Sequence, residues 1–274
     1  MTTSPLPEYT KPPVSEVALS VMFAPLEKWR SVHAGVFWSK IKDRYPSTEN
    51  YPPIANQMEV FDQDPKPLKS MTFRLDVHNP DAQRYWFLAD PPTKLIQVQR
   101  DRFVVNWRKV KGDEAYPRYE KELRPRFAEE WNALIAFLKE QDLGEPEVQQ
   151  CEVFYVNDML RPDDWKEFSD SLSLFSHWWA KSPEGFLPLP SSLNVSGSFT
   201  MPDKAGRLHF TSQRVFRAID EREAVHLQLF ARGKPKSSSL DDILSWMDLG
   251  REWVVRGFTD LTSPEAHKLW GRKQ

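Results

Sequence analysis

Short runs in which apolar and polar residues alternate are the sequence feature that most constrains this fold. They occur at 16–23, 84–89, 94–99 and 102–109, and again at 147–157, 193–201, 207–219 and 224–232. A period of two residues is typical of a β-strand with one buried face. Because only a short turn separates several neighbouring runs, we expect antiparallel hairpins.

Apolar residues at helical spacing separate these groups of runs. They predict a helix at 27–44, a long helix at 117–141, one from Asp163 or Asp164 to about Trp179, and one at 239–261 followed by a short helix near Trp270. Pro125 falls inside the long helix and should kink it or mark its true start. We also expect a strand at 71–77 and an edge strand near 58–61.

The order of elements is strand, helix, antiparallel strands and long helix, and it occurs twice. We therefore predict an α+β fold of two similar halves, 15–145 and 146–274, after an extended arm at 1–14. Glu16-Val17 before Trp29 matches Glu152-Val153 before Trp165, at an offset of about 136 residues. We expect the helices of each half to cover one sheet face, an order similar to TATA-binding-protein-like and helix-grip folds.

Composition and missing motifs exclude several function classes. The chain holds 37 Lys+Arg against 39 Asp+Glu, which argues against a general polyanion binder, and its one Cys cannot form an internal disulfide. No apolar run is long enough to span a membrane and no signal pattern opens the chain, so we expect a cytoplasmic location. Phosphate-loop, dinucleotide, zinc-helix and nucleophile-elbow motifs are missing, so we expect no cofactor, no metal and no catalytic residue.

Two predicted hairpins carry the candidate binding residues. Alternation places one set of polar side chains opposite the apolar face of each hairpin: Gln97, Gln99, Asn106 and Arg108 in the first, and His209, Gln213, His226 and Gln228 in the second. If helices cover the apolar faces, these residues share an uncovered face. Amides and guanidinium groups recognise a polar chain, a nucleobase or a carboxylate. A sheet face that is merely solvated carries the same residue types.

Two other function classes remain open. Arg100, Arg102, Lys109, Lys111 and Arg118 form a basic stretch interleaved with aromatic residues, which suits single-stranded nucleic acid. Acidic residues in the same stretch argue against that class. An enzyme could instead use His209 and His226 as acid and base groups on adjacent strands.

A resemblance supports the emphasis on the first hairpin. The run Gln97–Arg108 reads Gln-x-Gln-x-x-Arg-Phe-x-x-Asn-Trp-Arg, with Pro12–Val17 near the start and Phe258, Leu261-Thr262 and Trp270-Gly271 near the end. In these segments the chain resembles a sporadically distributed, uncharacterised prokaryotic protein family. The resemblance implies a patchily inherited protein, from mobile or defence-related loci, with no established activity. We expect a binding protein whose partner is another protein, such as a toxin, an effector or a subunit from the same locus.

Overall fold

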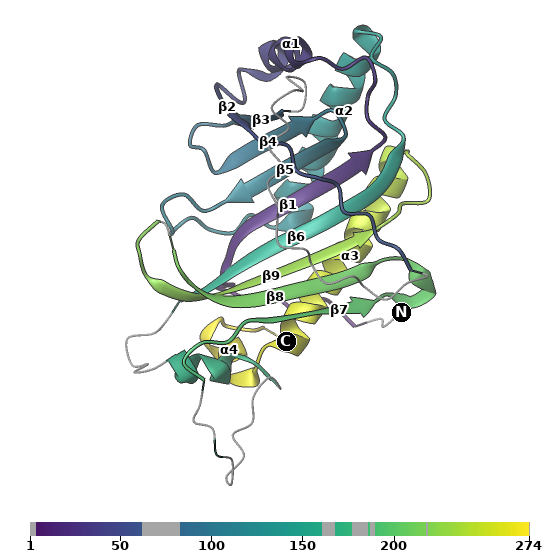
Figure 1. Cartoon of the computed structure of the whole chain (residues 1–274). Helices are drawn as coiled ribbons and strands as arrows, with labels where there is room; N and C mark the ends of the chain where they lie inside the picture. The colour runs from purple at the N-terminus through teal and green to yellow at the C-terminus, as the bar shows by residue number, and fades with distance from the viewer. Residues whose placement is uncertain are drawn as a thin grey trace.

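The computed structural model describes residues 4–61, 83–160, 168–176, 186, 190–217 and 219–273. Nine strands form one antiparallel sheet in the order β2-β3-β4-β5-β1-β6-β9-β8-β7 (Figure 1). The strands are β1 (Val14–Phe23), β2 (Ser47–Tyr51), β3 (Arg84–Leu88), β4 (Lys94–Gln99), β5 (Arg102–Arg108), β6 (Val148–Leu160), β7 (Val195–Thr200), β8 (Arg207–Phe216) and β9 (Glu223–Gly233). The helices are α1 (Ser31–Ile41), α2 (Arg124–Glu140), α3 (Leu240–Leu261) and α4 (Pro264–Leu269). The predicted α+β class is confirmed.

Strands β1 and β6 form the middle of the sheet. β1 pairs with β5 on one side and with β6 on the other, and β6 pairs onward with β9. Each half of the chain therefore supplies one side of the sheet, and the two sides meet at the β1–β6 pair. Leu19 lies opposite Val105 and Val153 in these pairs, so the apolar residues of the three strands share one face.

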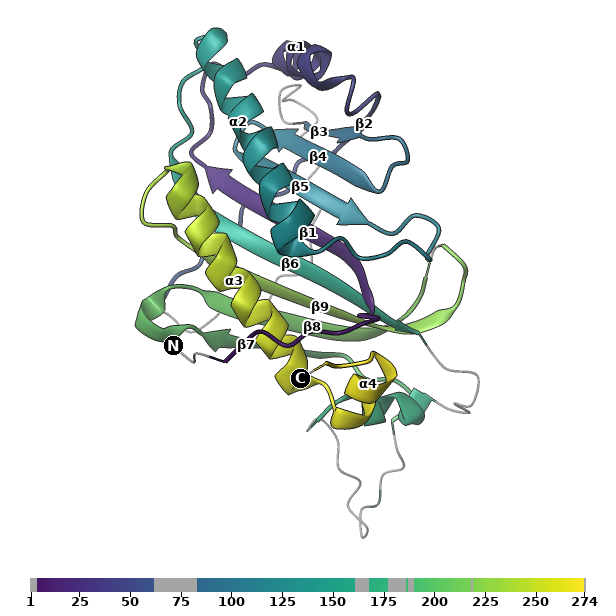
Figure 2. The ribbon, with the colours of Figure 1, turned by 180° about the vertical axis from the view of Figure 1, so that it is seen from behind.

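Helices α2 and α3 cover that apolar face side by side (Figure 2). The Phe103 ring of β5 packs against two rings of α2. Its centroid lies 6.1 Å from that of Phe127 and 5.7 Å from that of Trp131. The middle of α3 packs closely on β6. A Cβ added at Gly250 of α3 would lie 3.1 Å from the Val153 side chain of β6. The core is therefore a layer of aromatic and branched side chains between the helices and one side of the sheet.

Several element boundaries differ from the sequence prediction. The helix expected at 117–141 is a π-helical turn at Tyr119–Leu123 followed by α2, and Pro125 lies in the first turn of α2, where its missing N–H needs no partner. The helix expected at 27–44 covers only Ser31–Ile41. No periodic pattern predicts β2, a strand of mostly exposed polar residues that is specified by its pairing with β3.

Two further expectations are wrong in the described residues. No strand forms at 58–61, which is irregular. The described part of the helix expected to reach Trp179 is a 3₁₀ helix that ends at Leu174, because Phe175 forms a β-bridge with Thr262 instead. The strand expected at 71–77 lies outside the described residues. Across the described ranges, no helix has the length and apolar character needed to cross a bilayer.

The end of β9 is sensitive to any added side chain. A Cβ at Gly233 would lie 2.3 Å from the Ala205 carbonyl oxygen and 2.7 Å from the Trp246 indole, whose Nε1 donates to that same carbonyl. We predict that Gly233→Ala lowers the free energy of unfolding by about 2 kcal/mol, as overpacking does elsewhere. Chemical denaturation measures this change. At Gly35, inside α1, no atom lies within 4 Å of the added Cβ, so Gly35→Ala should not destabilise. Equal effects at both sites would contradict the packing described here.

Candidate functional site

The candidate binding residues project from the sheet face that points away from α2 and α3. Directly opposed residues of antiparallel strands point to the same side. Asn106 lies opposite Ala18 and Leu95, Gln97 opposite Trp86 and Val104, and His226 opposite Asp158 and Gln213. These residues alternate with Phe103, Val105 and their equivalents beneath the helices. The prediction that they share one face, called the polar face below, is confirmed by the register.

The expectation that this face is uncovered is wrong for its first half. Gln97, Gln99 and Asn106 are only 6%, 3% and 2% exposed. Arg108, His209, His226 and Gln228 are half-buried, and only Gln213 is exposed. Buried amides need hydrogen-bond partners, and the structure supplies them from neighbouring strands and from a segment that crosses the sheet.

Three hydrogen bonds join neighbouring strands across the first half of the polar face. Arg84 Nη1 donates to Gln97 Oε1 at 3.0 Å, Gln97 Nε2 donates to Asn106 Oδ1 at 2.8 Å, and Asn106 Nδ2 donates to Glu16 Oε1 at 2.7 Å. Burial raises the pKa of Glu16, although the Asn106 hydrogen bond and the Arg108 charge oppose that rise. Asn106 therefore holds a carboxyl group that would otherwise be left without a donor.

A histidine–carboxylate pair lies in the second half of the polar face. His226 Nδ1 is 2.7 Å from Asp158 Oδ1, and the Gln228 amide Nε2 is 2.9 Å from His226 Nε2. Since an amide nitrogen only donates, His226 accepts at Nε2, and its proton at Nδ1 is donated to Asp158. Burial would raise the pKa of Asp158, but hydrogen bonds from His226 and Ser15 lower it on balance.

Residues 52–61, called the strap below, leave β2 and cross the polar face obliquely toward β8 (Figure 1). Gln99 forms two hydrogen bonds with one strap residue: its Oε1 accepts from the Ile54 N–H at 3.0 Å and its Nε2 donates to the Ile54 carbonyl at 2.9 Å. Further along, Gln150 binds two strap residues: its Oε1 accepts from the Glu59 N–H at 2.8 Å and its Nε2 donates to the Gln57 carbonyl at 2.9 Å. Two glutamine side chains thus bind the strap by its main chain.

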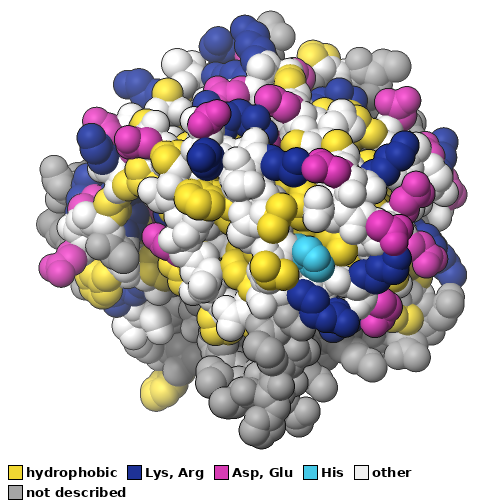
Figure 3. Space-filling model, turned by 90° about the horizontal axis from the view of Figure 1, so that it is seen from above, with side chains coloured by type: hydrophobic (Ala, Val, Ile, Leu, Met, Phe, Trp, Pro, Cys, Tyr) yellow, Lys and Arg dark blue, Asp and Glu magenta, His cyan; other side chains and the backbone are white. Residues whose placement is uncertain are grey.

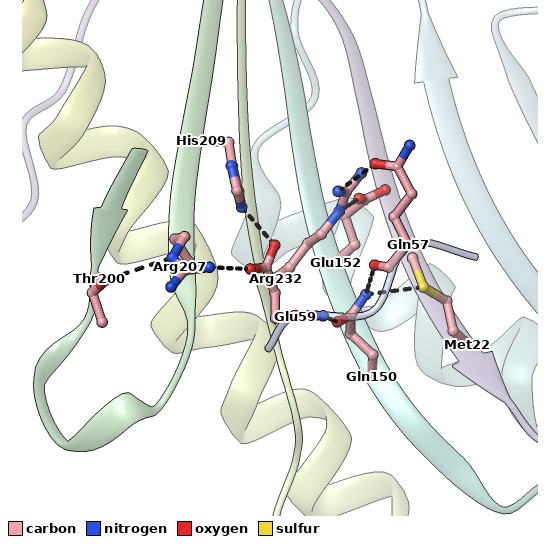
Figure 4. Close-up of polar contacts among 9 residues, drawn as sticks. All are labelled: Met22, Gln57, Glu59, Gln150, Glu152, Thr200, Arg207, His209 and Arg232. Atoms are coloured by element: carbon pink, nitrogen blue, oxygen red, sulfur yellow. Dashed lines mark hydrogen bonds and ion pairs between the residues drawn. The ribbon is translucent and has the colours of Figure 1, made fainter. Parts of the chain in front are cut away.

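The strap ends in a buried carboxylate site (Figure 4). Arg207 Nη1 donates to Glu59 Oε2 at 2.9 Å, and His209 Nε2 lies 2.5 Å from Oε1. The Glu59 side chain is 8% exposed. Burial would raise the pKa of Glu59, but the His209 hydrogen bond and the charges of His209, Arg207 and Arg232 outweigh burial and lower it. The site therefore favours an ionised carboxylate.

The apolar side chains are a minor part of the attachment of the strap. Met58 is 43% exposed and Val60 is 50% exposed, whereas Ile54 and Phe61 are half-buried. Glu59, between Met58 and Val60, points toward the sheet. A neutral hydrogen bond stabilises by about 0.5–1.5 kcal/mol and one to a charged group by about 1.5–3 kcal/mol. Polar contacts, for which water competes, are therefore the main attachment of this segment.

Sequence reasoning missed five residues that lie in the strap or beneath it. Gln150, Glu152, Arg207 and Arg232 lie on the polar face by the same alternation that placed His209 and Gln228 there, so the signal was present. Arg232 forms an ion pair with Glu152 beside the strap. Glu59 carried no usable signal, because an irregular segment has no period that fixes where it lies.

The residues of the predicted basic patch are not brought together. Arg102 is buried on the polar face, and burial lowers its pKa. Arg100 is paired with Glu27 at one end of β5, whereas Lys109 and Lys111 lie beyond the other end, roughly 20–25 Å away at about 3.4 Å per strand residue. Arg118 donates to the Tyr9 carbonyl on the helix side. The face at the α1 end also mixes charges of both signs (Figure 3).

The two histidines proposed as acid and base are apart as well. His209 lies opposite Phe230, four residues along β9 from His226, which corresponds to about 13 Å. Each histidine has its own carboxylate partner. The described residues contain no group of three or more side chains that could hold a metal ion.

A cavity of about 320 Å³ lies on the helix side, between the N-terminal arm and α3. Tyr155, Arg251 and Phe258 line it, and Arg118 is the only candidate residue among its walls. The hydroxyl groups of Tyr116 and Tyr155, also in its lining, hydrogen-bond to each other at 2.9 Å. The polar face and this cavity are therefore separate features on opposite sides of the sheet.

Comparisons of the chain with protein-family models, curated proteins and solved structures find no match.

Acid should weaken the attachment of the strap to the sheet, because it protonates the Glu59 carboxylate. A carboxyl group whose pKa is lowered on folding stabilises the folded state above its unfolded pKa, near 4.5, and loses that contribution as the pH falls through its folded value. We predict that the wild-type free energy of unfolding decreases below about pH 4.5 more steeply than that of Glu59→Gln. Urea denaturation at several pH values measures both. Parallel curves would show that Glu59 is not held as an ionised group.

Glu16 should behave in the opposite way. Its raised pKa means that ionisation destabilises the fold as the pH rises above the unfolded value. Glu16→Gln keeps an oxygen that accepts from Asn106 and removes the buried charge. We predict that this variant is more stable than wild type at pH 7 and that the difference shrinks toward pH 4. A variant less stable at pH 7 would mean that attraction to Arg108 exceeds the penalty of burial.

Proposed function

We propose that this is a non-enzymatic binding protein that docks a segment of a partner protein on the polar face of its sheet. The observation that carries the proposal is the way that face holds the strap. Side chains of β4, β6 and β8 bind an extended main chain and one carboxylate. A side-chain amide that accepts from a peptide N–H and donates to a peptide C=O is suited to binding a polypeptide main chain.

The accessible part of the polar face is the proposed contact surface. Gln213 of β8 is exposed and lies opposite His226 of β9, which is half-buried like Gln228 two residues further along the same strand. Arg108 of β5 is half-buried on the other side of β1 and β6. These residues offer amide, imidazole and guanidinium groups. This composition favours a polar, transient interface over an obligate one.

The charges on this face favour a protein over a nucleic acid. Glu16, Glu59, Glu152 and Asp158 lie among its arginines, so the face lacks the unbroken positive charge that holds a phosphate backbone. The basic residues that could hold phosphates lie at different ends of the molecule, as described above. Nucleic acid is therefore the alternative that the binding experiment below tests.

We also propose that the two halves descend from one duplicated α+β unit of TATA-binding-protein-like topology. Glu16 of β1 lies opposite Arg108 of β5, and Glu152 of β6 lies opposite Arg232 of β9. The same Glu–Arg register thus occurs between the innermost strand of each half and the next strand outward. On this proposal the polar face is a doubled surface, continuous across the β1–β6 pair.

Peptide selection tests the proposed function. We predict that the full chain enriches ligands from a phage library of random 12-residue peptides, and that the double variant Gln213→Ala/Gln228→Ala weakens their binding about tenfold, as the loss of one or two hydrogen bonds does. Fluorescence polarisation of the labelled peptides measures the dissociation constants. Asn132→Ala, an exposed amide on α2 at the opposite face, is the matched control and should change nothing.

Two outcomes contradict the proposal. One is a failure to enrich any peptide, or binding that ignores the two glutamine substitutions. The other is tight binding of a 20-nucleotide single-stranded DNA that weakens steeply with salt, which would assign the surface to nucleic acid instead.

A further inference from the structure

We propose that the strap occupies its part of the polar face in place of a partner segment, and that the partner displaces it with an extended segment carrying a carboxylate at the position of Glu59. This inference rests on the proposed protein-binding function and specifies the chemistry of the partner. It concerns residues 52–61 and the side chains that hold them, all of which are described above.

The strap is held at several points by its main chain. Gln99 and Gln150 contact main-chain N–H and C=O groups of the strap, which any extended peptide presents. Among the strap side chains, Asn56 contacts Asp101 and Arg102, and Gln57 contacts Arg232. Glu59 is the strap side chain that brings a charge into a buried site. A site that reads a main chain at two points and a carboxylate at a third would accept another chain of the same form.

The spacing of these contacts defines the form of the partner segment. Gln99 holds residue 54, and Gln150 holds the carbonyl of residue 57 and the N–H of residue 59, whose own carboxylate enters the Arg207 site. The partner segment should therefore be extended over at least six residues, with its acidic residue near the C-terminal end. Arg207 also lies over the Phe61 ring, 5.2 Å from its centroid, so an aromatic residue two positions further on fits the same register.

The side chains around the strap carry an excess of positive charge. Arg102, Arg207 and Arg232 surround it, whereas the neighbouring carboxylates are Glu152 of β6 and Asp101 of the β4–β5 turn. Once Glu59 leaves, these side chains retain an excess of positive charge in a poorly solvated site, and a second carboxylate restores the balance. A neutral or basic segment would not.

The strap buries little apolar surface. Met58 and Val60 face solvent and only Ile54 and Phe61 are half-buried, so release of the strap exposes less apolar surface than usually anchors a docked segment. An intramolecular segment nevertheless has a high effective concentration, so a free peptide competes poorly with an intact strap. Weakening the strap should therefore reveal the site.

A peptide with the sequence of residues 52–61 is the direct probe, and the full chain carrying Glu59→Lys is its receptor. The introduced ammonium faces Arg207 and His209 and should release the strap. We expect the labelled peptide to bind this variant at least about tenfold more tightly than wild type, and its Glu-to-Gln version to bind about tenfold more weakly. Adding Arg207→Ala should abolish binding. Glu145→Lys makes the same charge change at an exposed site outside the strap and should behave as wild type.

The inference is overturned if the peptide binds neither chain, or binds the Glu59→Lys chain equally well with and without Arg207. Circular dichroism and the thermal midpoint show whether Glu59→Lys is folded; if it is not, Glu59→Gln is the receptor, with the same order of affinities expected and the same results overturning the inference.

Hydrogen exchange separates this inference from the proposed function. A library-selected peptide added to wild type should speed exchange at the amides of Ile54 and Glu59. If such peptides bind through Gln213 and Gln228 while these amides stay protected, the strap is not displaced, and the inference fails while the function stands. If the strap peptide binds and no library peptide does, the proposed function fails instead.

Discussion

Most polar side chains taken out of water on the second face of this sheet are paired by hydrogen bonds within the chain, and this pairing organises the molecule. Ser20 Oγ and Trp86 Nε1 are buried there without a partner among the described residues. Helices α2 and α3 cover the apolar face, which leaves the polar residues of alternate positions on the other side. Enough of them are buried that they must be satisfied within the chain. Arg84, Gln97, Asn106 and Glu16 satisfy one another across four strands, and the strap satisfies Gln99 and Gln150. The candidate site is thus a consequence of how the sheet is built.

The alternation of residues allowed much of the fold to be predicted. It located eight of the nine strands and assigned Phe103 and Asn106 to opposite faces, because a strand has only two sides. It missed β2, whose sequence Ser47–Tyr51 is polar at every exposed position and is defined by its partner. It also overestimated the helix before Phe175, because a long-range bridge to Thr262 overrides local preference there.

The same alternation placed the candidate residues on one face but could not say what covers them. Exposure depends on what packs over a residue from a distance, and the strap has no periodic pattern that reveals its course. Asn106 illustrates the difference, since the sequence suggested an open binding group and the structure shows a buried link to Glu16. Gln213 and Gln228, nearer the sheet margin, remain candidates for direct contact. The binding surface is therefore expected on the β8–β9 side and beneath the strap.

The central claim is that the strap is docked by polar contacts and separable from the sheet. Native-state hydrogen exchange of the Ile54 and Glu59 amides tests this most directly, because it gives the free energy of local opening. The account predicts measurable protection at both amides, with opening that costs less than that of the β1 and β6 amides. Protection equal to that of the central strands would make the strap an inseparable part of the core, and no protection would mean that it is not docked; either result contradicts the claim.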